Sequence, residues 1–181
     1  MNTAIFFADG FEEIEGLTVV DMFRRAGIPI QTISISDSLT VTGSHDIKVQ
    51  ADCLLKDFDF NTVEMLILPG GLRGVASIRA CRPVLDAVRQ VAERGGWVAA
   101  ICAAPTVLAQ LGITDGRRAT CYPGMEPEMG SAVMSGEQTA QDGRIITGQA
   151  AGASIAFGLK LVEALRGEAA AQQVAAGIVA R

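Results

Sequence analysis

The sequence predicts an α/β fold in which helices cover both faces of a mainly parallel β-sheet. Short apolar runs alternate along the chain with longer amphipathic segments, the order expected when crossover helices connect parallel strands. The 181 residues are 49% hydrophobic, which is enough for a substantial core. No linker, repeat or low-complexity tract interrupts them. We therefore expect one domain over residues 1–181.

The first half of the chain contains strand, helix and hairpin patterns. Residues 3–7 and 28–35 are short runs typical of strands. Between them, residues 11–25 carry apolar side chains at helical spacing and predict an amphipathic helix. The runs 39–42 and 47–49 flank a turn-forming segment, Gly43-Ser44-His45-Asp46. This pattern predicts an antiparallel hairpin added to the sheet.

The second half repeats the alternation of strand and helix. Residues 63–68 and 97–101 are apolar runs that predict buried strands, and a glycine turn leads into the second run. Residues 83–94 have a helical period, and proline stands in the first turn of the helix expected at residues 103–109. A further strand and a further helix are expected at residues 144–147 and 154–165. Such sheets bind ligands beyond the carboxyl ends of their strands.

Charge and cysteine content exclude several classes of protein. The net charge is −5 and no basic run exceeds an arginine pair, which argues against a nucleic-acid surface. No signal-peptide pattern and no apolar run of membrane-spanning length is present, so we expect a cytoplasmic protein. The four cysteines lack CxxC spacing and a nearby histidine, so we expect free thiols and no metal site. They are Cys53, Cys81, Cys102 and Cys121.

Cys102 is the candidate nucleophile because it stands between a predicted strand and a predicted helix. Small residues on both sides suit a tight strand-to-helix elbow, which exposes a nucleophile above an α/β sheet. The N–H groups and dipole at the start of a helix favour thiolate over thiol, so a lowered thiol pKa is expected. The alternative is a buried core cysteine.

We do not expect histidine to activate this thiol. The chain has one histidine, His45, in the predicted hairpin, so a Cys-His dyad is disfavoured. We interpret His45 as a solvated turn residue, unless a subunit contact brings it closer to a site.

A carboxyl group is the alternative partner for the thiol. Glu12 and Glu13 suit the first turn of a helix, where they complement its dipole without further role. Glu15 differs, because its spacing places it on one stripe with Phe11 and Val19. Burial would raise its pKa, so a protonated Glu15 could donate a hydrogen bond to a thiolate and transfer protons. The alternative is that Glu15 borders the apolar face and reaches water.

The segment Pro69-Gly70-Gly71 ends a predicted strand at the same edge of the sheet. Glycines allow main-chain N–H groups to approach a ligand closely. Together with the N–H of Ala103, they could form an oxyanion hole. An ordinary loop has the same sequence pattern.

These segments together resemble the ThiJ/PfpI superfamily, specifically its DJ-one branch, whose members include deglycase-like and glutathione-independent glyoxalase-like proteins. The resemblance covers nearly the whole chain, and its matching segments are residues 8–15, 68–71, 99–105 and 157–165. It implies a flavodoxin-like three-layer α/β/α sandwich, a homodimer, and a reactive cysteine paired with a protonated glutamate. Cys102 and Glu15 match that pair, and Gly71 and Ala103 match its backbone donors.

The chain also departs from this family. Tyr122 occupies the place of a histidine found near the nucleophile in some members, so it could donate a hydrogen bond but not act as an imidazole. Ala103 stands where the protease branch has histidine, which argues against peptidase activity. The loop 148–152 lacks the Gly-Pro pair of some relatives. Cys121 is either a second thiol at the rim or a buried strand cysteine.

The sequence therefore predicts a cysteine-dependent enzyme that acts on small reactive carbonyls, without metal, cofactor or glutathione. Cys102 and Glu15 would be catalytic, and Gly70, Gly71, Ala103 and Tyr122 would bind the oxyanion or the substrate. The alternative is an oxidative-stress sensor or chaperone-like protein whose cysteine oxidises to sulfinate. In the expected homodimer, Arg25 or His45 would reach toward the partner's site. A flavin or phosphate module lacks the required glycine-rich loop.

Overall fold

A computed structural model describes residues 2–180 and contains a central seven-stranded sheet. The strand order is β10-β11-β7-β6-β1-β2-β5, and every neighbouring pair is parallel except β10 and β11. The strands are β1 (Thr3–Phe7), β2 (Ile30–Ser34), β5 (Cys53–Leu54), β6 (Met65–Leu68), β7 (Trp97–Ile101), β10 (Thr139–Asp142) and β11 (Ile145–Gly148). This arrangement confirms the predicted α/β fold class.

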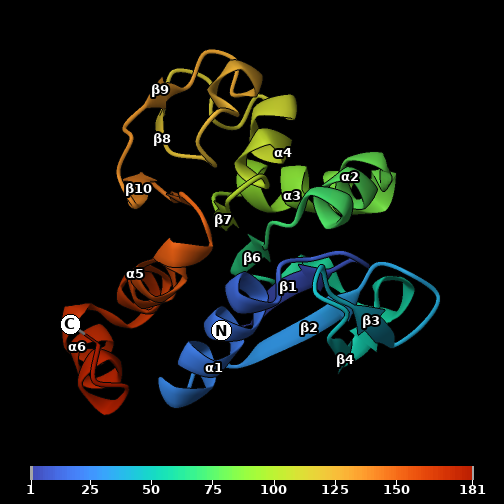
Figure 1. Ribbon diagram of the computed structural model, residues 1–181, viewed down its shortest axis with the longest axis horizontal. Coiled ribbons are helices and arrows are strands. Elements are labelled where there is room, and N and C mark those ends of the chain that lie inside the picture. The colour runs from blue at the N-terminus through green and yellow to red at the C-terminus, as the bar shows by residue number, and fades with distance from the viewer. Residues whose placement is uncertain (1, 181) are drawn as a thin grey trace.

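Helices cover both faces of the sheet, as Figure 1 shows. One face packs against α1 (Glu13–Arg25), α5 (Ser154–Arg166) and α6 (Glu168–Gly177), and the other against α2 (Leu72–Ala80), α3 (Arg82–Glu93) and α4 (Pro105–Gln110). Alternating strand residues supply the two cores: in β1, Phe6 joins one cluster and Phe7 the other. The remaining helical turns are short 3₁₀ segments: η1 (Leu55–Asp57), η2 (Phe60–Thr62), η3 (Glu126–Glu128) and η4 (Ala151–Ala153).

The predicted hairpin forms, but it is not an extension of the central sheet. Among the described residues, its strands β3 (Thr40–Thr42) and β4 (Lys48–Gln50) pair with each other and with no other strand. The Gly10 N–H donates to Thr42 O at 2.7 Å, and the Ser44 N–H donates to Phe11 O at 2.8 Å. The hairpin therefore lies against the loop that precedes α1.

Several boundaries differ from those predicted. Helix α1 begins at Glu13 rather than residue 11, and α4 begins at Pro105 rather than residue 103. A second small parallel sheet, β8 (Arg118–Ala119) with β9 (Val133–Met134), was not expected. None of the described helices combines the length and the apolar character needed to cross a bilayer.

Candidate active site

Cys102 follows the last residue of β7 and adopts a left-handed backbone conformation, with φ of 65°. This conformation is rare for residues with a side chain and stores strain. Two backbone bonds hold it: the Cys102 N–H donates to Gly148 O at 3.0 Å, and the Tyr122 N–H donates to Cys102 O at 2.7 Å. The side chain is partly buried. The structure thus places the thiol at the carboxyl edge of the sheet, as predicted.

Glu15 lies in the first turns of α1 and is fully buried, with 0% of its surface exposed. This burial confirms the prediction from its position on the apolar stripe and excludes the alternative in which it reaches water. Its Oε2 accepts the Gly70 N–H at 2.8 Å. Its Oε1 is buried and has no hydrogen-bond partner among the described residues, so it is free to carry a proton.

Gly70 brings the acid and the thiol together. A Cβ at this position would lie 2.5 Å from Glu15 Oε2 and 3.1 Å from Cys102 Sγ. Only glycine allows the three segments to meet here. Gly71 has φ of 91°, and a Cβ there would collide with the backbone before α1. The predicted glycine turn is therefore a close packing junction between β6, β7 and α1.

The acid and the thiol titrate as a coupled pair. Burial raises the pKa of Glu15 to about 7, although hydrogen bonds to the thiol and to Gly70 oppose this. Burial, the charge of Glu15 and the hydrogen bond to the Glu15 carboxyl raise the pKa of the Cys102 thiol to about 12. Hydrogen bonds from the N–H groups of Ala103 and Gly71 lower this pKa, but by less. The predicted lowering of the thiol pKa is therefore wrong, because burial outweighs these N–H groups. Around neutral pH the pair loses one proton rather than two.

Ala103 and Tyr122 each approach Cys102 with a backbone N–H group. Ala103 is buried and its carbonyl accepts the Thr106 hydroxyl at 2.7 Å, whereas its N–H interacts with the thiol. Tyr122 is close to Cys102 through its backbone, but its side chain is 48% exposed. The phenol makes no hydrogen bond with any residue that the structure describes. Its predicted role therefore depends on a bound substrate.

The other cysteines lie apart from Glu15. Cys121 is buried, and this burial, reinforced by two nearby glutamates, raises its pKa to about 11. This position favours the buried-cysteine interpretation over a second reactive thiol. Cys53 belongs to the edge strand β5, and Cys81 joins α2 to α3.

His45 has a structural role that the sequence interpretation missed. Its Nδ1 lies 2.8 Å from Glu13 Oε2, and its N–H donates to Glu13 Oε1 at 2.7 Å. Burial alone would raise the pKa of Glu13, but the hydrogen bonds from His45 and Ser44 lower it to about 2. Glu13 therefore anchors the hairpin, which neither its helix position nor its charge indicated. Glu12, Glu13 and His45 also offer three possible metal ligand atoms within 4.8 Å of one another.

Comparison with known proteins places the chain in a family. The DJ-1/PfpI family matches residues 1–164. Protein dj-1beta of Drosophila melanogaster is 34% identical over 180 residues, which cover 98% of this chain and 96% of that protein. A Caenorhabditis elegans protein named glutathione-independent glyoxalase DJR-1.2 is 30% identical over 158 residues, or 86% of this chain and 83% of that protein.

Solved structures give the same result. The crystal structure of Drosophila melanogaster DJ-1beta superimposes with a TM-score of 0.94 at 34% identity, covering 99% of this chain and 98% of that one. A structure of Toxoplasma gondii DJ-1, described as oxidized, gives a TM-score of 0.95 at 28% identity and covers 98% of this chain and 97% of that one. The likeness extends over the whole flavodoxin-like fold. The chain therefore belongs to the DJ-1/PfpI family.

Proposed function

We propose that this protein is a cysteine-dependent enzyme that converts small 2-oxoaldehydes, such as methylglyoxal, into 2-hydroxy acids. The observation that carries the proposal is the meeting of Glu15 and Cys102 at Gly70, where a single Cβ would contact both side chains. An acid that shares a proton with a thiol can supply and remove protons while sulfur holds a carbonyl carbon. The name of the Caenorhabditis elegans relative supports the same substrate class.

The reactive state is the one in which the pair holds a single proton. With this proton on Glu15, the negative charge lies on the Cys102 sulfur beside the N–H groups of Gly71 and Ala103. The sulfur attacks the aldehyde carbon and forms a hemithioacetal, whose oxyanion takes the proton from Glu15. The carboxylate is then ready to act as a base.

Proton transfer between adjacent carbons completes the proposed reaction. Glu15 removes the hydrogen of the former aldehyde carbon as a proton and delivers it to the neighbouring carbon, while the hydroxyl proton moves to the ketone oxygen. The ketone becomes an alcohol and the hemithioacetal becomes a thioester of Cys102. Water cleaves the thioester, releases the 2-hydroxy acid and restores the thiol. Early glycation adducts of proteins or nucleotides would enter through the same first steps.

The test is turnover of methylglyoxal by purified protein without glutathione, with lactate measured as product. We expect Cys102→Ala to abolish turnover and Glu15→Gln to lower kcat by about 100-fold or more, the usual contribution of a general acid-base. Cys81→Ala is the matched control and should leave turnover unchanged. Lactate formation by Cys102→Ala at the rate of the unmodified protein would refute the proposal.

A redox sensor is the second candidate function, and the site offers a specific reason for it. A protonated Glu15 with a free Oε1 and the N–H of Ala103 could stabilise the oxygens of a sulfinate on Cys102. The oxidized state of the Toxoplasma gondii neighbour is consistent with this chemistry. Stoichiometric oxidation of Cys102 by peroxide, combined with no turnover of methylglyoxal, would favour the sensor.

We also propose that the protein works as a cytoplasmic homodimer. Exposed apolar side chains on α1 and α5, including Ile14 and Ile155, offer a surface for a second copy. Within one chain, Arg25 is bound to Asp21 at 2.6 Å and His45 is bound to Glu13. A role for either residue in the partner's site requires that these pairs rearrange. Sedimentation across a dilution series, run alongside the turnover assay, tests this: a fully active monomer would contradict the shared site.

A further inference from the structure

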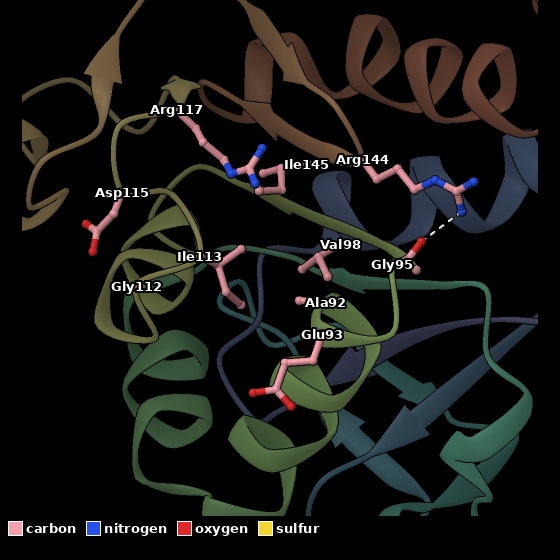
Figure 2. A pocket seen from close by; sticks show the side chains of 11 residues that line it. Ala92, Glu93, Gly95, Val98, Gly112, Ile113, Asp115, Arg117, Arg144 and Ile145 are labelled. Carbon is pink, nitrogen blue, oxygen red and sulfur yellow. Dashed lines mark hydrogen bonds between the residues drawn. The ribbon is translucent and has the colours of Figure 1, made fainter.

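A cavity of about 670 Å³ (Figure 2) lies near the amino ends of β7 and β11. Cys102 lies at the opposite, carboxyl end of β7. Val98 lies near the amino end of β7 and Ile145 begins β11, whereas Cys102 follows the carboxyl end of β7. Together with Ala92 and Ile113, these residues give the cavity an apolar floor. Its volume falls within the range of small-molecule sites, about 300 to 1,000 Å³. The cavity is therefore separate from the candidate active site.

Two opposite charges flank this floor. Figure 2 shows Glu93, at the end of α3, and Arg117, in the segment after α4, on opposite sides of the apolar side chains. Glu93 makes no hydrogen bond or ion pair with any residue in the described part of the chain. Arg117 has one long ion pair, with its Nη1 3.4 Å from Asp142 Oδ1. Both side chains thus have capacity for a ligand.

The other two charged residues of the lining are already engaged. Arg144 donates to Gly95 O at 2.8 Å, and its guanidinium lies over the Trp97 ring at 5.6 Å from the centroid. Asp115 accepts the Ser131 hydroxyl at 2.8 Å, and Figure 2 shows it pointing away from the floor. These contacts leave Glu93 and Arg117 as the charges available to a ligand.

We propose that this cavity binds a small linear zwitterion, a molecule with a carboxylate and an ammonium group at the two ends of a short apolar chain. The carboxylate would pair with Arg117, the ammonium with Glu93, and the chain would cover Ala92 and Ile113, which are only partly buried. Space for it exists, because a Cβ on Gly95 would meet no atom within 4 Å. A ligand with only one charge would pair with either Glu93 or Arg117 and would leave the other side chain without a partner in the ligand.

Three matched probes test the charge requirement: ε-aminocaproate carries both charges, caproate only the anion and hexylamine only the cation. Trp97 is the only tryptophan of the chain. It does not line the cavity, but the lining residue Arg144 lies over its ring, so a ligand that moves Arg144 should change its fluorescence. We expect ε-aminocaproate to bind about fivefold more tightly than either single-charge probe, the effect of one partly exposed ion pair. The amide NMR signals of Gly95 and Gly112 should shift with the same dissociation constant.

Glu93→Gln should remove the preference over caproate, and Arg117→Gln should remove the preference over hexylamine. Both residues are exposed, so folding should be unaffected. Arg82→Gln, at the opposite end of α3, is the matched control and should retain it. Equal affinity of the unmodified protein for the three probes would overturn the proposal. The absence of saturable shifts at Gly95 and Gly112 would overturn it as well, as would an unchanged preference over caproate in Glu93→Gln.

Discussion

Replacing Glu15 by glutamine should remove a loss of stability that the native protein suffers as pH rises. The pKa of a free glutamate is 4.5, and burial raises that of Glu15 to about 7. Below pH 4.5 the group is protonated in the folded and unfolded states, so it contributes no pH dependence. Above it, the unfolded chain releases the proton while the folded chain keeps it until about pH 7. The free energy of unfolding therefore falls across this window.

The size of the effect follows from the two pKa values. A rise from 4.5 to about 7 corresponds to about 3 kcal/mol, at about 1.4 kcal/mol for each factor of ten. Solvent does not screen this effect, because Glu15 is 0% exposed. Most of this loss should occur between about pH 5 and about pH 8.

Urea unfolding of the native protein and of Glu15→Gln across this pH range measures the effect. Glu93→Gln, which replaces an exposed glutamate, is the matched control and should follow the native profile. Glu13 raises the pKa of His45, so His45 also loses a stabilising contribution as pH rises. That contribution is common to all three proteins and cancels in their differences. Parallel profiles for the native protein and Glu15→Gln would refute the reasoning.

Three further predictions concern the same site. Alkylation of Cys102 by iodoacetamide should accelerate as pH rises through about 7, where the pair loses its first proton. Glu15→Ala should move the midpoint of this acceleration to higher pH. Alkylation rates measured by mass spectrometry at a series of pH values test both expectations. Mild peroxide should add two oxygens to Cys102 before it modifies the other three cysteines, which peptide mass mapping will show. Preferential oxidation elsewhere would identify a different reactive residue. Gly70→Ala should lower turnover strongly and destabilise the fold by about 1 to 3 kcal/mol, because its Cβ would overpack the site; a native unfolding curve would contradict the close packing.

The sequence predicts those features that depend on local pattern. The bounds of β7 agree with the expected strand, and the apolar stripe of α1 placed Glu15 correctly in the interior. Other elements lacked such a pattern: half of the residues of α6 are alanine, and α2 begins directly after a glycine pair and contains Gly74. The hairpin's attachment to Glu13 depends on contacts between distant segments, which periodicity does not reveal.

The direction of the thiol pKa could not be predicted for the same reason. The expected lowering considered only the N–H groups that follow Cys102 along the chain. Its burial and the charge of Glu15 come from segments that meet only in the folded protein, and these effects are larger. Sequence pattern therefore identified the two partners but not the balance between them.

The left-handed backbone at Cys102 has a consequence for how the protein evolves. Glycine adopts this conformation without a steric penalty, so Cys102→Gly should relieve local strain at the end of β7. A chain selected for stability alone would have reason to lose its cysteine. A thiol at this position therefore costs the fold some stability, and the main-chain bonds to Gly148 and Tyr122 help to hold the strained backbone in place.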